Sequence, residues 1–199
     1  VVAHPAGNTG TQMGGWFRKE IRSLSDLQGL KMRIAGIAGQ VLAPLGVVAQ
    51  QLAGGDVYPA LERGTLDATE FVGPYDDEKL GFYQVAPFYY YPAFWEAGPT
   101  VHFIFNTAKM EELPASYRTA LETASGLCNI RMQADYDVKN MRAIRSLVGK
   151  GVQLRPFPRD VLDAAYESAQ KLYAQLDASN AKWKTIYDPW SQFRTQAFE

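Results

Sequence analysis

The chain of 199 residues carries 20 Lys and Arg against 21 Asp and Glu, a formal charge of −1, with 21 % charged and 47 % hydrophobic residues. These ordinary values exclude a disordered or fibrous chain, and the lack of a basic excess argues against a nucleic-acid partner. A single cysteine, Cys128, excludes an internal disulfide and a cysteine-rich zinc site, and two histidines are too few for a histidine-built metal site. No stretch of about 18 residues is apolar enough to span a membrane.

The chain opens on an apolar stretch, Val1–Pro5, which is typical of a strand that runs directly into a loop. It has no initiating methionine and no signal-peptide pattern. A folded domain seldom begins on an apolar strand with nothing before it, so we expect residue 1 to be a cut through a longer protein.

Turn residues and hydrophobic spacing predict the elements of the first part of the chain. In order, they are a loop over 5–15, a strand at Trp16–Phe17, a helical turn at Ser25–Gly29, a strand at Lys31–Ala35, helices at Val41–Leu52 and Asp56–Arg63, and a strand at Leu66–Val72. Gly64 is expected to end the second of these helices.

The second part of the chain is richer in helix. The predicted elements are a short helix at Pro74–Phe82, an aromatic run at Phe88–Trp95, a strand at Thr100–Asn106, a long helix opened by Pro114, a strand at Val152–Leu154, a helix at Arg159–Leu176 and an aromatic tail over 183–198. The long helix has roughly 30 residues and a length of about 45 Å. A helix of this length is expected to span two lobes rather than pack within one. Short strands that alternate with helices indicate an α/β fold with at least partly parallel sheets.

Arg33 is the first polar residue in an unexpected place, because it lies in an otherwise apolar strand. Its guanidinium either reaches solvent or a structural carboxylate, or it clamps an anionic ligand bidentately. Both alternatives stay open on the residue pattern alone.

Glu70 and Glu96 are two further polar residues at the ends of apolar segments. Glu70 stands near the end of a strand, where α/β sheets bind ligands, and Glu96 closes the aromatic run. The two carboxylates are compatible with an acid/base pair of a hydrolase or with oxygen ligands of a hard cation. No Ser-His-Asp or Cys-His signature accompanies them, and His102 is interpreted as structural.

Five separated motifs resemble the extracytoplasmic solute receptors of TRAP transporters, the DctP family. They are residues 24–33 (LSDLQGLKMR), 61–68 (LERGTLDA), 6–17 (AGNTGTQMGGWF), 70–77 (EFVGPYDD) and 89–99 (YYYPAFWEAGP). The last three are similar to the TakP-like branch, which binds 2-oxo acids and lactate together with a cation. The resemblance covers nearly the whole chain. It implies a two-lobed fold like that of periplasmic binding proteins, of which this chain is the C-terminal part.

The resemblance also implies roles for individual residues. Arg33 matches the arginine that pairs with the substrate carboxylate, and Asn106 resembles an asparagine that faces the cleft. The implied cation ligands are the side chains of Gln12, Glu70 and Glu96 and the backbone carbonyl of Phe71, where the family usually has tryptophan. Oxygen ligands of this kind suit Na⁺ or Ca²⁺.

The same resemblance implies a periplasmic solute-binding subunit rather than an enzyme, with TRAP membrane subunits and a second copy of the chain as partners. We expect residues 1–105 to complete the N-terminal lobe and cross into the second lobe. Residues 106–176 are expected to supply the long helix and the closing elements. Residues 177–199 are expected to form a dimerisation helix, because a frayed tail would not carry five aromatic residues, and Pro189 is expected to break it. The alternative is that these rings cover the chain's own lobes.

Overall fold

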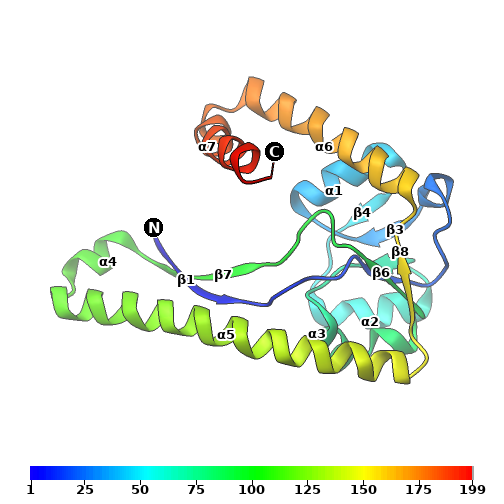
Figure 1. The fold of residues 1–199 in the computed structure, drawn as a ribbon, viewed down its shortest axis with the longest axis horizontal. Coiled ribbons are helices and arrows are strands. Elements are labelled where there is room, and N and C mark those ends of the chain that lie inside the picture. The colour runs from blue at the N-terminus through cyan, green and yellow to red at the C-terminus, as the bar shows by residue number, and fades with distance from the viewer. Residues whose placement is uncertain (199) are drawn as a thin grey trace.

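The computed structural model describes residues 1–198, which form a six-stranded sheet with helices on both faces and a separate two-stranded ribbon (Figure 1). The large sheet has the strand order β4-β3-β5-β2-β6-β8. Its strands are β2 (Gly15–Phe17), β3 (Lys31–Arg33), β4 (Val48–Gln50), β5 (Ala68–Thr69), β6 (Phe88–Tyr91) and β8 (Gln153–Pro156). β3 is parallel to β4 and β5, β6 is parallel to β8, and β2 is antiparallel to β5 and β6. The expected partly parallel sheet is confirmed.

Helices make up most of the remaining chain. They are α1 (Gly36–Leu42), α2 (Gly54–Arg63), α3 (Pro74–Leu80), α4 (Thr107–Glu112), α5 (Ala115–Gly149), α6 (Arg159–Ser179) and α7 (Ala181–Phe198), with short 3-10 helices at Leu24–Leu27, Ala43–Leu45 and Phe82–Gln84. Among the described residues, 1–198, no helix has the length and apolar character needed to cross a membrane.

The central strands are buried on both faces, because successive side chains of a strand point to opposite sides of the sheet. Trp16 and Tyr89 enter the core on the side of α2, whereas Phe17 and Tyr90 enter the core on the side of α6. All four rings are at most 1 % exposed. Residues that follow each other in sequence therefore support two separate cores, and the aromatic run of β6 is central to both.

The two-stranded ribbon pairs β1 (Val2–Asn8) with β7 (Thr100–Phe105) in antiparallel register. Figure 1 shows that this ribbon and α4 extend away from the large sheet, alongside the first part of α5. Ile104 is 68 % exposed and Phe103 47 %. The long helix α5 has 35 residues and contacts β1 of the ribbon at one part and α3, which packs beside the large sheet, at another. One helix therefore connects the two parts of the structure.

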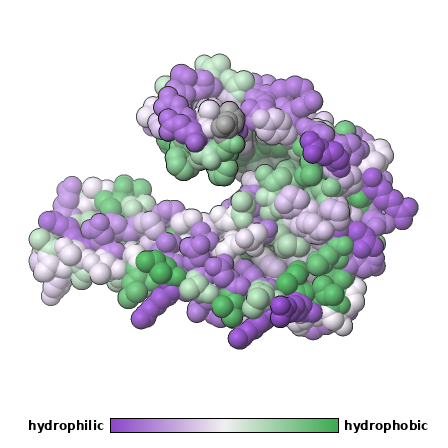
Figure 2. All heavy atoms as spheres, viewed as in Figure 1, coloured by the Kyte–Doolittle hydropathy of each residue, from purple (hydrophilic) through white to green (hydrophobic). Residues whose placement is uncertain are grey.

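Helix α7 folds back against α6, and its Trp183 and Tyr187 rings contact Tyr173 of that helix. Figure 2 shows apolar atoms on the underside of α7, above the hollow that separates it from the ribbon. α7 is one continuous helix with Pro189 inside it. The expectation that Pro189 breaks this segment is therefore wrong.

Several other expected boundaries need correction. Residues 41–52 are not one helix, because Gly46 takes a left-handed conformation (φ 98°) after the 3-10 turn and the chain then forms β4 beside β3. Residues 5–8 belong to β1 and not to a loop, since β7 supplies their hydrogen-bonding partner. The strand expected at 66–72 is only β5, two residues long.

The helix expected from Pro74 is confirmed, with that proline in its first turn and Gly81 as its left-handed C-cap.

Candidate functional site

Arg33 and Glu70 meet at the carboxyl ends of two neighbouring parallel strands. Arg33 is the last residue of β3, and Glu70 directly follows β5, which pairs with β3 in parallel. The Arg33 Nη1 donates to the Glu70 Oε1 and, over 3.1 Å, to the Glu70 backbone carbonyl, while Nε donates to the Leu52 carbonyl over 3.4 Å. Among residues 1–198, Nη2 of Arg33 has no hydrogen-bond partner, so one arm of the fork is uncommitted.

Gln12 brings an amide to the other oxygen of the same carboxylate. Its Nε2 donates to the Glu70 Oε2 over 3.3 Å, and its side chain is buried, as is that of Glu70. The Gln12 Oε1 is buried and finds no hydrogen-bond donor within the described residues. The loop that carries Gln12 leads into β2, whose first residue, Gly15 (φ 102°), lies close to β5: a Cβ at this position would be 2.5 Å from the Thr69 carbonyl oxygen. A buried acceptor without a donor costs free energy, so Gln12 Oε1 is a ready ligand for a cation.

Glu96 lies on the loop after β6, with its side chain exposed. The backbone amide of Gln12 donates to the Ala97 carbonyl over 3.0 Å, which places the Glu96 loop beside the Gln12 loop. Burial raises the pKa of the Glu70 carboxyl to about 7 against the opposing charge of Arg33, and the charges of Glu96 and Asp77 raise it further. The cluster therefore holds more carboxylate charge than Arg33 alone neutralises.

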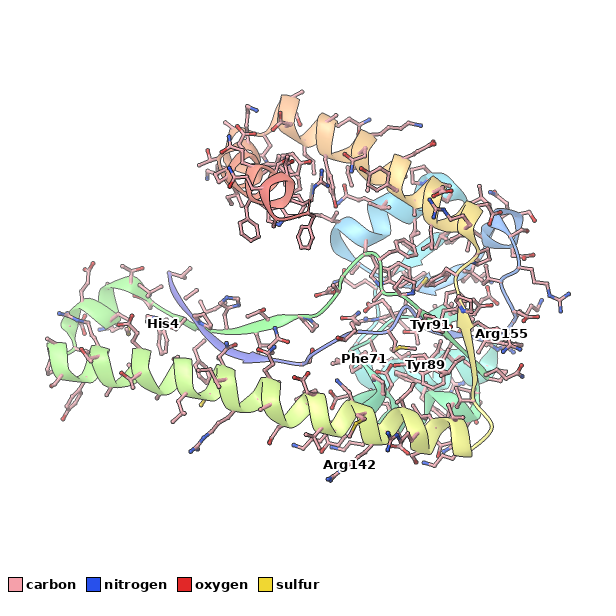
Figure 3. The ribbon with its side chains drawn as sticks, viewed as in Figure 1. His4, Phe71, Tyr89, Tyr91, Arg142 and Arg155 are labelled. Atoms are coloured by element: carbon pink, nitrogen blue, oxygen red, sulfur yellow. The ribbon has the colours of Figure 1, made fainter. Side chains whose placement is uncertain are left out.

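The Phe71 ring lies beside the guanidinium of Arg33. Its ring centroid lies 5.4 Å from the Arg33 Cζ, and it packs edge-on against Phe82 at 5.8 Å. Figure 3 shows Phe71 in the same part of the lobe as Tyr89 of β6. The ring position is compatible with a pocket wall, and its backbone carbonyl stands next in sequence to Glu70.

Asp77 holds the segment that follows Glu70 in place, and the sequence pattern did not identify it as a residue of the site. Its buried carboxylate accepts from Trp16 Nε1 at 2.9 Å and from the Tyr89 hydroxyl at 2.7 Å. It also accepts from the backbone amides of Val72 and Gly73, at 3.3 and 3.2 Å, which fixes the segment after Glu70. Burial raises the pKa of Asp77 to about 6 although these four hydrogen bonds oppose the rise. An acid in the first turn of a helix behind Gly-Pro was the available signal, and it indicated only helix capping.

Asn106 is not brought to the cluster within residues 1–198, and its predicted place in the cleft stays a prediction. It is the N-cap of α4, where its Oδ1 accepts from the Lys109 amide over 3.2 Å. α4 lies at the far end of the extension from β3 (Figure 1). The asparagine that closes β7 is explained by helix capping, since Asn is a favoured N-cap residue.

The remaining donors suit a hard cation. Within residues 1–198 no group of three or more His, Cys, Asp or Glu is placed to hold a metal. Two glutamates, the buried amide oxygen of Gln12 and a backbone carbonyl are oxygen donors, as Ca²⁺ and Na⁺ prefer. The unpartnered Gln12 Oε1 makes the set compatible with such an ion.

A family profile and a curated relative both match this chain and indicate the same family. The profile of the bacterial extracellular solute-binding proteins of family 7 (DctP) matches residues 1–180. A curated relative from Nostoc, named as a monocarboxylate 2-oxoacid-binding periplasmic protein, is 46 % identical over 198 residues, which are 100 % of this chain and 54 % of that protein.

Solved structures agree with this relationship. A TRAP transporter solute-binding protein from Bordetella bronchiseptica has a TM-score of 0.95 at 49 % identity, covering 98 % of this chain and 58 % of that one; it is a mixed-occupancy dimer with calcium and picolinate in one active site. A TRAP periplasmic solute-binding protein from Pseudoalteromonas atlantica, with bound sodium and pyruvate, has a TM-score of 0.84 at 36 % identity, covering 98 % and 63 %. One from Colwellia psychrerythraea, with calcium and pyruvate, has a TM-score of 0.85 at the same identity and coverage. The chain thus spans between half and two thirds of the length of these relatives.

Proposed function

The chain belongs to family 7 of the bacterial extracellular solute-binding proteins, the DctP family of TRAP solute receptors, and from this membership we propose what it binds. The ligand is a small monocarboxylate, a 2-oxo acid such as pyruvate or a 2-hydroxy acid such as lactate. It is captured together with a cation, Na⁺ or Ca²⁺, in the periplasm, for delivery to TRAP membrane subunits. The relatives with bound pyruvate and cation support this proposal.

The observation that carries the proposal is the cluster of Arg33, Glu70 and Gln12. An arginine that keeps one nitrogen uncommitted stands beside a buried carboxylate, and that carboxylate stands beside a buried amide oxygen without a donor. Such a cluster offers a donor for a ligand carboxylate and oxygen atoms for a cation within one site.

The roles follow from charge. Arg33 binds the carboxylate of the acid through its uncommitted Nη2, because a guanidinium N–H donates a charge-assisted hydrogen bond to a carboxylate. Gln12, Glu70, Glu96 and the carbonyl of Phe71 hold the cation. The cation supplies the positive charge that lets two glutamates and an anionic ligand share one site. Arg33 orients Glu70 and favours its ionised form, since its charge counteracts part of the rise in the pKa of that carboxyl caused by burial.

The hydrolase alternative, with Glu70 and Glu96 as acid and base, finds no support. The matched family consists of solute-binding proteins. We assign no catalytic role to either glutamate.

We also propose that α7 joins two copies of the chain. Its Trp183 and Tyr187 rings are occupied by the chain's own α6, but Ile186 and Phe193 are 75 % and 65 % exposed. The Bordetella relative is a dimer. A second copy of the chain is the occupant that we assign to this outer face of α7.

Isothermal titration calorimetry on the protein at its full natural length tests the ligand. Pyruvate, lactate, longer 2-oxo acids and a matched amine without a carboxylate are titrated in Ca²⁺, in Na⁺ and after chelation of divalent ions in a Na⁺-free buffer. We expect acids that place a second oxygen next to the carboxylate to bind only with a cation. Binding of the amine, or acid binding that ignores all cations, would contradict the proposal.

A further inference from the structure

Asn140 of the long helix α5 lies against two loops that come from distant parts of the chain. Its Nδ2 donates to the Thr9 carbonyl over 2.9 Å, and its Oδ1 accepts from the Tyr75 amide over 3.1 Å. An asparagine amide has a donor and an acceptor side by side, so it matches one carbonyl and one N–H at once. Neither a carboxylate nor a hydroxyl of similar size makes both contacts in this arrangement.

Both loops carry residues of the candidate site. Thr9 lies three residues before Gln12, and Tyr75 lies in the first turn of α3, four residues after Phe71. The loops also touch each other, because a Cβ on Gly73 would lie 3.5 Å from the Thr11 carbonyl oxygen and 3.6 Å from the Asn140 Oδ1. Asn140 therefore stands where the two ligand-bearing segments converge.

The neighbouring turn of α5 strengthens the same junction. The Tyr136 hydroxyl donates to Asp76 over 2.9 Å, and its ring meets Tyr75 edge-on at 5.7 Å. On the other loop, a Cβ on Gly10 (φ 69°) would lie 3.0 Å from the Asp137 Oδ1. The Thr9 and Gln12 amides in turn donate to the carbonyls of Pro99 and Ala97, next to Glu96. A chain of contacts thus runs from α5 through the Thr9–Gln12 loop to the Glu96 loop.

We infer that Asn140 is a positioning residue of the cation-and-carboxylate site. It fixes the separation of Gln12 from Glu70 by holding the Thr9–Gln12 loop to the start of α3, and it links that separation to the long helix. This inference rests on the proposed function for what the site binds. A ligand set drawn from separate loops binds a cation tightly only when the loops are held in place, and loss of a supporting hydrogen bond costs on the order of 10–100-fold in metal affinity.

The first test compares two asparagines of the same helix in the full-length protein. Asn140→Ala is matched by Asn129→Ala, eleven residues earlier, about 16 Å along α5, where Oδ1 has no hydrogen-bond partner within residues 1–198. Calorimetry with Ca²⁺ and pyruvate, at a temperature where both variants are folded, gives each affinity and the factor by which Ca²⁺ tightens pyruvate. We expect Asn140→Ala to weaken Ca²⁺ binding about tenfold and to reduce that factor, and Asn129→Ala to change neither.

A merely structural role would lower the melting temperature of Asn140→Ala and leave the Ca²⁺-to-pyruvate factor at the wild-type value, which would overturn the inference. Equal affinities in wild type and Asn140→Ala would overturn it as well.

Hydrogen exchange provides a readout that needs no ligand. In Asn140→Ala we expect faster amide exchange in residues 9–14 and 73–77 than in wild type. Asn140→Asp keeps an acceptor for the Tyr75 amide and loses the donor to Thr9, so faster exchange is expected in residues 9–14 alone. Unchanged exchange at 9–14 in both variants overturns the positioning role. If wild type binds none of the acids, the proposed function fails, and the exchange result decides the role of Asn140 by itself.

Discussion

Two pairs of stacked aromatic rings hold this molecule together in different ways. The inner pair, Trp16 and Tyr89 in the large sheet, has ring centroids 3.9 Å apart, and both residues are 0 % exposed. The outer pair, Trp183 and Tyr187 on α7, lies 5.4 Å apart. Both polar tips of the inner pair bond Asp77, whereas the buried Trp183 Nε1 has no partner in residues 1–198.

The two pairs differ in whether their contacts are completed within the chain. The inner pair is complete within the chain, and through Asp77 it fixes the segment that follows Glu70. Ile186 and Phe193 of α7 are exposed, and Trp190 of the same helix lines a groove of about 610 Å³ formed with α1, α6 and the loop after β6. A cluster of large apolar side chains that stays exposed is typical of a protein–protein interface. We therefore associate the inner pair with ligand binding and the outer pair with the second copy.

The largest expected effect comes from the same substitution in both pairs. Trp16→Phe removes volume from a filled core and removes a hydrogen-bond donor from the buried carboxylate of Asp77. We therefore expect the free energy of unfolding to fall by about 2–4 kcal/mol. Trp183→Phe removes a ring that is only half-buried and breaks no hydrogen bond within residues 1–198, so a loss below about 1 kcal/mol is expected. Urea unfolding measures the free energy of unfolding of both variants. Equal losses would contradict the proposed difference between the inner and the outer pair.

Arg33→Lys should separate ligand binding from assembly. Lysine keeps the charge but loses the planar fork, so we expect pyruvate to bind at least about tenfold more weakly, or about 1.4 kcal/mol. The mass of the assembly should stay the same, because Arg33 lies far from α7 in sequence and on a different element. Calorimetry and light scattering give the two results. An unchanged pyruvate affinity would remove Arg33 from the site.

Burial of Asp77 beside the inner pair makes the stability of the fold depend on pH. The pKa of Asp77 is raised from 3.8 to about 6 in the folded chain, so the native state holds the proton more tightly than the unfolded state. The stabilisation from this proton is present below about pH 4 and is lost as the pH rises through 6, with a slope of at most about 1.4 kcal/mol per pH unit. We expect Asp77→Asn to lack this slope. Unfolding curves at pH 4, 5, 6 and 7 compare the two proteins, and parallel pH profiles would contradict the account.

The smallest effect on ligand binding is expected at the outer face of α7. Phe193→Asp places a charge on an apolar surface that is 65 % exposed, so folding should change little. If a second copy covers this face, the dimer should weaken by at least about tenfold, while pyruvate affinity stays within about twofold. Sedimentation equilibrium provides the measurement. A variant that associates as wild type does would place the contact elsewhere.

Much of the fold was predictable because it depends on local spacing. Pro74 and Gly81 bound α3, and the absence of proline from residues 115–149 allows the 35-residue helix. The place of Glu70 at the carboxyl end of a strand was predictable as well, whereas its ion pair with Arg33, at the end of β3, was not. The domain boundaries at 105/106 and 176/177 stay a prediction.

The elements and site residues that the sequence did not predict share a physical cause: each depends on a residue far away in the sequence. β4 forms only because β3 lies beside it, and residues 5–8 of β1 are extended only because β7 pairs with them. Asp77 and Asn140 take their roles from contacts with residues 61 and 131 positions away, respectively, at Trp16 and Thr9. The capping role of Asn106 is local, since its Oδ1 accepts from the Lys109 amide three residues later, and its place in the cleft stays a prediction.

The most direct test of the central claim is the location of the cation. Crystals of the full-length protein grown with Ca²⁺ and pyruvate, measured for anomalous scattering, show where the ion lies. We expect a single peak within bonding distance, about 2.3–2.6 Å, of the Gln12 Oε1 and of carboxylate oxygens of Glu70 and Glu96, with the Arg33 guanidinium on the pyruvate carboxylate. A peak away from Gln12 and Glu70, or pyruvate bound without contact to Arg33, would contradict the account.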